Sequence, residues 1–301
     1  MKIFSLSLAT IFLAISLVAS ASASASANAI SPKEALNLIK YTDSAIDEIM
    51  PIIEKSRQVM TDYVNEGITK EKATISIQKA KAEIMSIQSS LNKYENDETM
   101  SSYEKNYRKS LNILVDITDK QLKFINKNSL NKASIKNVTV TQTKDLYLFL
   151  EKYSQAEREL LNKVFFDKEP SKIQQYILWR KDITKIADKH RELSFKTEVI
   201  LIDFYFSEDI SKVKNDIKNI ISQTSEIARE YDKCEYNEDL ETLHNMLKNG
   251  AVENESLVKA IESFIENSDE DNLAKMEKHI TNAQELGQEF KTQTKIYINK
   301  L

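Results

Sequence analysis

The chain has 301 residues, of which 41% are hydrophobic and 29% are charged, a composition typical of a folded globular protein. Its 42 basic and 46 acidic residues are interleaved and give a formal net charge of -4. This balance lacks the basic footprint by which proteins attract nucleic acid, so we expect no nucleic-acid partner. Only 3 Gly and 3 Pro occur, too few for the turns of a β-rich fold. The composition therefore predicts an all-α protein.

The first 29 residues resemble a secretory signal peptide. Lys2 precedes an apolar run over residues 3–18, and a run of small residues then leads to an Ala-x-Ala pattern that ends at Ala29. A retained membrane span needs about 20 apolar residues, whereas this run is shorter and is interrupted by Ser and Thr. We expect cleavage after Ala29 and export to the periplasm or out of the cell.

The first predicted helix begins at Ser31, where Ser31 and Glu34 form a capping box with Pro32 between them. Its apolar positions continue to residue 63, and Pro51 predicts either a kink or a division into two helices. Gly67 follows at a position that favours a left-handed residue.

Three more helices are predicted in the first half of the chain. Residues 69–94 carry a regular apolar seam, and a second capping box at Ser101 and Glu104 opens a helix that runs to residue 125. The polar residues 126–141 predict a long loop, and residues 146–164 form the next helix. Pro170 marks a break, so we place a domain boundary between residues 168 and 169.

The second half follows the same plan. Residues 173–206 carry apolar residues at alternate steps of three and four, which predicts a long helix buried on one side. A second helix over residues 210–231 follows a cap at residues 207–209. A third is predicted to be interrupted at Gly250, and the last covers residues 273–297.

The two halves match each other when one is shifted by about 137 residues. Ile183 then falls on Ile46, and Tyr231 falls on Tyr94. We therefore predict two tandem antiparallel four-helix bundles over residues 30–168 and 169–301. A single elongated bundle or coiled coil is the alternative, because any two heptad patterns can be aligned in this way.

Residues suited to catalysis or metal binding are few. His190 occupies a seam position, where a histidine bonded to a buried polar neighbour is expected. Glu241 and His244 form the single Glu-x-x-His pair, whereas a di-metal site in a bundle needs two such pairs and further carboxylates. We therefore expect no metal, no cofactor and no enzymatic activity. The single cysteine, Cys234, is either without a role or forms an intermolecular crosslink.

The aromatic residues Trp179, Phe204, Tyr205 and Phe206 suggest a contact surface, because neighbouring aromatic side chains on one helix cannot all face the same core. Packing between the two halves is the alternative for this group. We predict an exported, non-enzymatic helical protein that binds another protein through its bundle faces. The alternative function is a membrane-active or pore-forming helical protein, for which residues 199–206 are the candidate contact.

Overall fold

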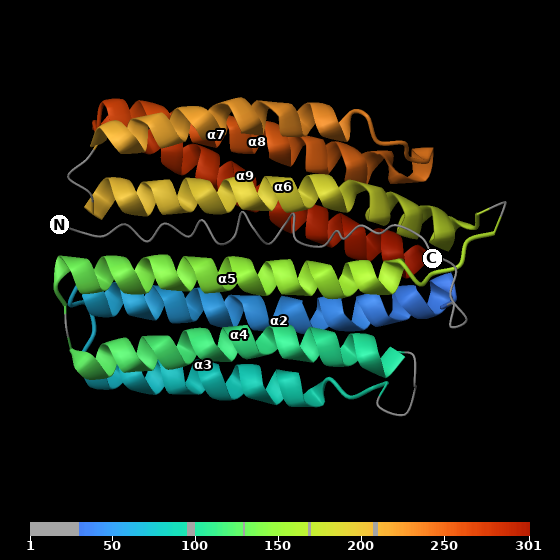
Figure 1. Ribbon diagram of the computed structural model, residues 1–301, viewed down its shortest axis with the longest axis horizontal. Helices are drawn as coiled ribbons and strands as arrows, with labels where there is room; N and C mark the ends of the chain where they lie inside the picture. The colour runs from blue at the N-terminus through green and yellow to red at the C-terminus, as the bar shows by residue number, and fades with distance from the viewer. Residues whose placement is uncertain (1–29, 95–99, 129, 168–169, 207–209) are drawn as a thin grey trace.

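The computed structural model describes residues 30–94, 100–128, 130–167, 170–206 and 210–301, and these residues are almost entirely helical (Figure 1). The predicted signal peptide and the cap at residues 207–209 lie outside the described residues. The helices are α2 (Pro32–Val64), α3 (Lys70–Ser90), α4 (Met100–Lys127), α5 (Lys132–Leu161), α6 (Lys172–Phe206), α7 (Ile210–Tyr231), the short 3-10 helix η1 (Glu238–Leu240), α8 (Glu241–Glu266) and α9 (Glu270–Lys300).

Each α-helix packs against the next one along the chain, and successive α-helices run in opposite directions (Figure 1). As a result, α2 and α6 run parallel to each other, with α5 antiparallel to both. Contacts of α2 with α6 join the beginning of the chain to its second half. The all-α class is therefore confirmed.

The capping box at the start of α2 is also confirmed. The backbone N–H of Ser31 donates to Glu34 Oε2 at 3.0 Å, and the N–H of Glu34 donates to Ser31 Oγ at 3.3 Å. Two N–H groups at the open end of the helix are thereby satisfied, and Pro32 needs no such partner.

The structure decides three expectations that rested on Pro or Gly residues. Pro51 lies inside one continuous helix, on its exposed side, so the division into two helices does not occur. Gly67 does not take the left-handed conformation, which Glu66 adopts with φ of 60°. Gly250 lies inside the continuous helix α8, so the predicted interruption is absent.

Two predicted features of α4 and α5 also need correction. The long loop over residues 126–141 is not observed, because α4 continues to Lys127, Asn131 caps α5, and the polar residues from Lys132 onward are helical. Ser101 does not cap α4, which already begins at Met100. The carboxylate of Glu104 accepts the backbone N–H of Tyr94 at 3.1 Å instead of closing a capping box.

Buried apolar side chains form three clusters. One lies among α2, α3, α4 and α5, and a smaller one lies near the end of α2. The largest combines residues of α6, α7, α8 and α9 with residues from the start of α2 and the end of α5. The predicted boundary at residues 168 and 169 lies outside the described residues and stays a prediction.

The interior glycine of α8 offers a test of helix stability. A Cβ atom added at Gly250 meets nothing within 4 Å, so Gly250→Ala should raise the free energy of unfolding by roughly 0.5–1 kcal/mol. Gly67→Ala is the control, since its Cβ would lie 3.3 Å from the Asp62 carbonyl oxygen. Urea unfolding followed by circular dichroism measures both variants. A loss of stability in Gly250→Ala would contradict the continuous helix.

Candidate functional site

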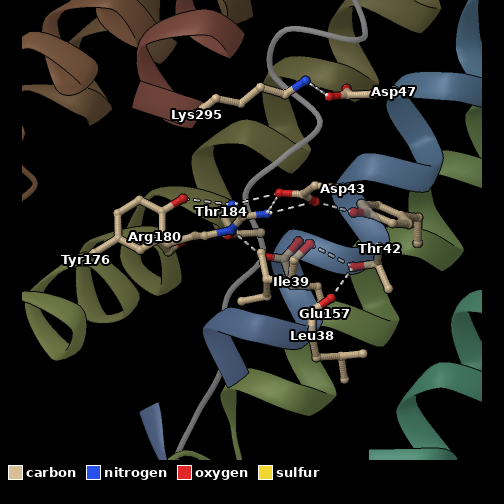
Figure 2. Close-up of polar contacts among 11 residues, drawn as sticks. Leu38, Ile39, Thr42, Asp43, Asp47, Glu157, Tyr176, Arg180, Thr184 and Lys295 are labelled. Atoms are coloured by element: carbon tan, nitrogen blue, oxygen red, sulfur yellow. Dashed lines mark hydrogen bonds and ion pairs between the residues drawn. The ribbon is translucent and has the colours of Figure 1, made fainter. Parts of the chain in front are cut away.

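The most unusual feature of the interior is a group of ionisable side chains where α2, α5 and α6 meet (Figure 2). We call it the buried charge cluster and define it as Asp43, Tyr153, Glu157, Tyr176 and Arg180. The three charged members come from three helices, and Arg180 and Glu157 are at most 1% exposed at their side chains. The cluster joins residues from both sides of the predicted domain boundary.

Arg180 lies at the centre of the buried charge cluster and uses all three guanidinium nitrogens. Its Nε–H donates to Glu157 Oε1, and one terminal nitrogen donates to the hydroxyl oxygen of Tyr176 at 2.9 Å. The shortest distance from the guanidinium to Asp43 is 3.3 Å, to Oδ2. The other carboxylate oxygen of Asp43 accepts the Tyr153 O–H at 2.5 Å. These bonds replace the water that a buried cation loses.

The charges in the buried charge cluster do not balance if every group is ionised, because two carboxylates face one guanidinium. Burial raises the pKa of Glu157 to about 7, although attraction to Arg180 opposes that shift. Burial likewise raises the pKa of Asp43. Burial alone would lower the pKa of Arg180, but the nearby carboxylate of Glu157 raises it overall. Burial thus favours the neutral form of both carboxyl groups, and the charge of Arg180 favours their ionised form.

Further ion pairs connect these helices to one another and to α9. Glu198 of α6 accepts from Arg57 of α2 at 2.5 Å and from Thr143 of α5 at 3.0 Å. Asp47 of α2 pairs with Lys291 of α9 at 2.5 Å and also with Lys295 (Figure 2). Polar contacts therefore run along α2 from the buried charge cluster toward its C-terminal end.

His190 is buried as its seam position predicts, but its expected polar partner is missing. The residue is fully buried, and neither ring nitrogen has a hydrogen-bond partner in the described structure. Burial lowers the pKa of His190 to about 3, and the neighbouring Arg191 adds to the shift. The imidazole is therefore neutral at physiological pH.

His244 lies in the core, which the sequence did not suggest. Its Nδ1 accepts the indole N–H of Trp179 at 3.3 Å, while Nε2 lies 3.0 Å from the Tyr231 carbonyl oxygen. Together these partners define a neutral ring protonated at Nε2. Tyr236 stacks on the ring at a centroid distance of 4.1 Å. Glu241 is exposed, so the Glu-x-x-His pair does not converge.

The four aromatic residues predicted as a contact surface do not share one environment. Trp179 is 3% exposed and packs in the largest core cluster. Phe204, Tyr205 and Phe206 are half-buried at the end of α6, where Phe204 lies 5.8 Å from the Phe264 ring. Their packing against core clusters leaves only part of each ring for a partner, and a contact role stays a prediction.

Other sequence features are placed as follows. Within the described residues, no helix has a segment long and apolar enough to cross a bilayer. The same part of the chain contains no group of three or more His, Cys, Asp or Glu side chains placed to hold a metal ion. Cys234 is a free, half-buried thiol whose pKa is raised by burial.

A polar hollow of about 330 Å³ lies between α4 and α5. Its lining includes the small side chains of Ser110 on α4 and Ala156 on α5. The Glu159 carboxylate at its rim already accepts amide N–H groups of Asn106 and Gln155, at 3.1 and 3.3 Å.

Sequence reasoning did not identify the buried charge cluster. Arg180 follows the seam residue Trp179 directly, and Asp43 follows the seam residue Thr42, so each lies at the edge of an apolar stripe. A long polar side chain beside a seam is common on helix surfaces, where its head reaches water. One signal was available in the sequence. Asp43 and Arg180 are 137 residues apart, which equals the shift that aligns the two halves.

Removal of the central cation should destabilise the protein strongly. Arg180→Met leaves two buried carboxyl groups without their partner and should lower the free energy of unfolding by about 3–5 kcal/mol. Arg158→Met is the control, because the Arg158–Asp188 pair is partly exposed and its loss should cost about 1 kcal/mol or less. Urea unfolding measures both. Equal losses in the two variants would show that burial of Arg180 carries no special cost.

His190 should make stability depend on pH in the acidic range. The unfolded chain binds a proton near the ordinary histidine pKa of 6.5, whereas the folded chain resists protonation down to about 3. The unfolded state thus binds more protons in this window, and stability falls as pH drops through it, by up to ~1.4 kcal/mol per pH unit. His190→Leu should remove this loss.

The measurement is the free energy of unfolding of wild type and His190→Leu across this pH range. The difference between them should grow as pH falls below 6.5 and should be constant above it, where the histidine is neutral in both states. A difference that does not change with pH would contradict the buried, neutral assignment.

Comparisons with protein-family models, with curated proteins and with solved structures found no match to this chain.

Proposed function

We propose that this chain is an exported, non-enzymatic helical protein that binds another protein through its bundle faces. The observation that supports it best is the outer side of α3, an edge helix that packs against α2 and α4 (Figure 1). Ala73, Ile77, Ala80 and Ile84 fill its buried side. A second stripe, which we call the α3 outer stripe, consists of Ile75, Gln78, Ala82, Met85 and Ser89.

The α3 outer stripe has the spacing of a helix-pairing surface. Its members follow one another at alternate steps of three and four residues, as in the seams of coiled coils, and all five are exposed. Ile75 is 59% exposed and Met85 is 47% exposed, while Ala82 between them is small enough for close approach. Burial of the two large side chains would contribute roughly 1–2 kcal/mol each to a complex.

Charges beside the stripe favour an acidic partner. Lys72 and Lys79 lie along one flank, and Lys79 is 75% exposed at its side chain with only a 3.8 Å contact to Glu83. Lys81 on the other flank pairs with Asp119 at 2.6 Å. We therefore propose a partner helix that presents an apolar ridge bordered by Asp or Glu.

We also propose that the architecture arose as two tandem four-helix bundles by duplication, divided between residues 168 and 169. The contact between Asp43 and Arg180 supports this, because the two residues are 137 positions apart, equal to the sequence shift. They lie on the first helix of each half, and those helices run parallel (Figure 1). We propose that residues 1–29 direct export and are then removed.

Photo-crosslinking in the cells that make the protein tests the binding surface. A photoreactive residue at Ala82 should capture a discrete partner protein. The double variant Ile75→Asp and Met85→Asp should lose this adduct, because it places two charges in an apolar contact. Val252→Asp on α8 is the matched control, as Val252 is 46% exposed and should not affect capture.

Circular dichroism should show the same helix content for all variants, since the substituted side chains are exposed. Capture that survives the double variant, or that is equally sensitive to Val252→Asp, would contradict the α3 outer stripe as the binding surface.

A further inference from the structure

Two tyrosine rings and a lysine form a small aromatic box at the end of α3. Tyr41 of α2 and Tyr94, which follows α3, meet edge to face with their centroids 6.1 Å apart and their planes at 76°. The ammonium nitrogen of Lys93 lies 5.5 Å from the centroid of Tyr41 and 5.4 Å from that of Tyr94. A cation is thus held by two π faces at once.

A buried carboxylate contacts the backbone of this box. Glu104 of α4 is 2% exposed, its Oε2 accepts the Tyr94 backbone N–H at 3.1 Å, and its Oε1 has no hydrogen-bond partner in the described structure. Burial raises the pKa of the Tyr41 phenol, and the nearby charge of Glu104 raises it further. Arg108, one turn after Glu104, donates to the Leu91 carbonyl oxygen.

These groups have the chemistry that recognises organic cations. Aromatic faces attract a cation through the ring quadrupole. A carboxylate adds charge attraction, which does not require the cation to donate a hydrogen bond. We propose that Tyr41, Tyr94 and Glu104 form a binding site for an alkylammonium group, in which Lys93 is an internal occupant that a ligand displaces.

Lys93 is suited to displacement. Its side chain is exposed, and its ammonium is compact and strongly hydrated, so release to water costs little. A trimethylammonium group is broader and less hydrated, and therefore covers both rings better. The site does not depend on the proposed protein partner, because Lys93 and Tyr94 follow α3 and lie outside the α3 outer stripe.

Binding of choline to the full-length protein, followed by saturation-transfer NMR on the choline methyl signal, tests the proposal. Lys93→Ala should tighten binding about two- to fivefold, since it removes the competing cation. Tyr94→Leu and Glu104→Gln should weaken or abolish it. Lys181→Ala is the matched control and should leave affinity unchanged, because Lys181 lies 5.8 Å from the Phe166 ring in a separate cation–π pair.

No choline signal from either wild type or Lys93→Ala would overturn the proposal, as would equal affinities in Lys93→Ala and wild type. Retained binding in both Tyr94→Leu and Glu104→Gln would also overturn it. Cosedimentation with phosphatidylcholine vesicles identifies the source of the group. Binding to vesicles and to choline supports a lipid headgroup, whereas binding to choline alone supports a soluble ligand.

Discussion

The interaction on which the arrangement of helices depends is that of the Arg180 guanidinium with the carboxylates of Asp43 and Glu157. A cation removed from water costs several kcal/mol unless hydrogen bonds and opposite charges replace the lost hydration. Here α2 and α5 each supply one carboxylate, and α6 supplies both the cation and Tyr176. Because all these contacts need hydrogen-bond distances, they fix the axial position of α2 relative to α6. Apolar packing alone would allow α2 to slide slightly along α6, whereas the hydrogen bonds of Arg180 do not.

Much of the helical structure follows from local sequence patterns. The seam over residues 173–206 predicted α6 within one residue of its observed bounds, and the Ser31 cap predicted the start of α2. The errors occurred where a local preference was weaker than helix packing. Gly250 costs too little to interrupt a helix with buried residues on both sides of it. Residues 132–141 are mostly polar, but Ile135 and Val138 among them pack in the cluster near the end of α2, so polarity alone did not indicate a loop.

The candidate sites were less predictable because they depend on contacts between distant segments. No local pattern pairs Arg180 with Glu157, and the same residues on an isolated helix would extend to water. Trp179 was both a seam residue and a candidate for a contact surface, and in the structure its indole N–H donates to His244 in the core. The aromatic box formed by Tyr41, Lys93 and Tyr94 likewise needs α2 beside the end of α3. Sequence periodicity defines which faces are buried, but not which polar side chains meet there.

The parallel run of α2 and α6 has a consequence for how the chain unfolds. Separation of the two parts of the chain would leave Asp43 and Glu157 on one side and Arg180 on the other, so the ion pairs between them would be lost. The largest apolar cluster would be divided at the same time, since it includes the start of α2 and the end of α5. Opening between the parts therefore exposes charge and apolar surface together, which couples their unfolding into one cooperative transition.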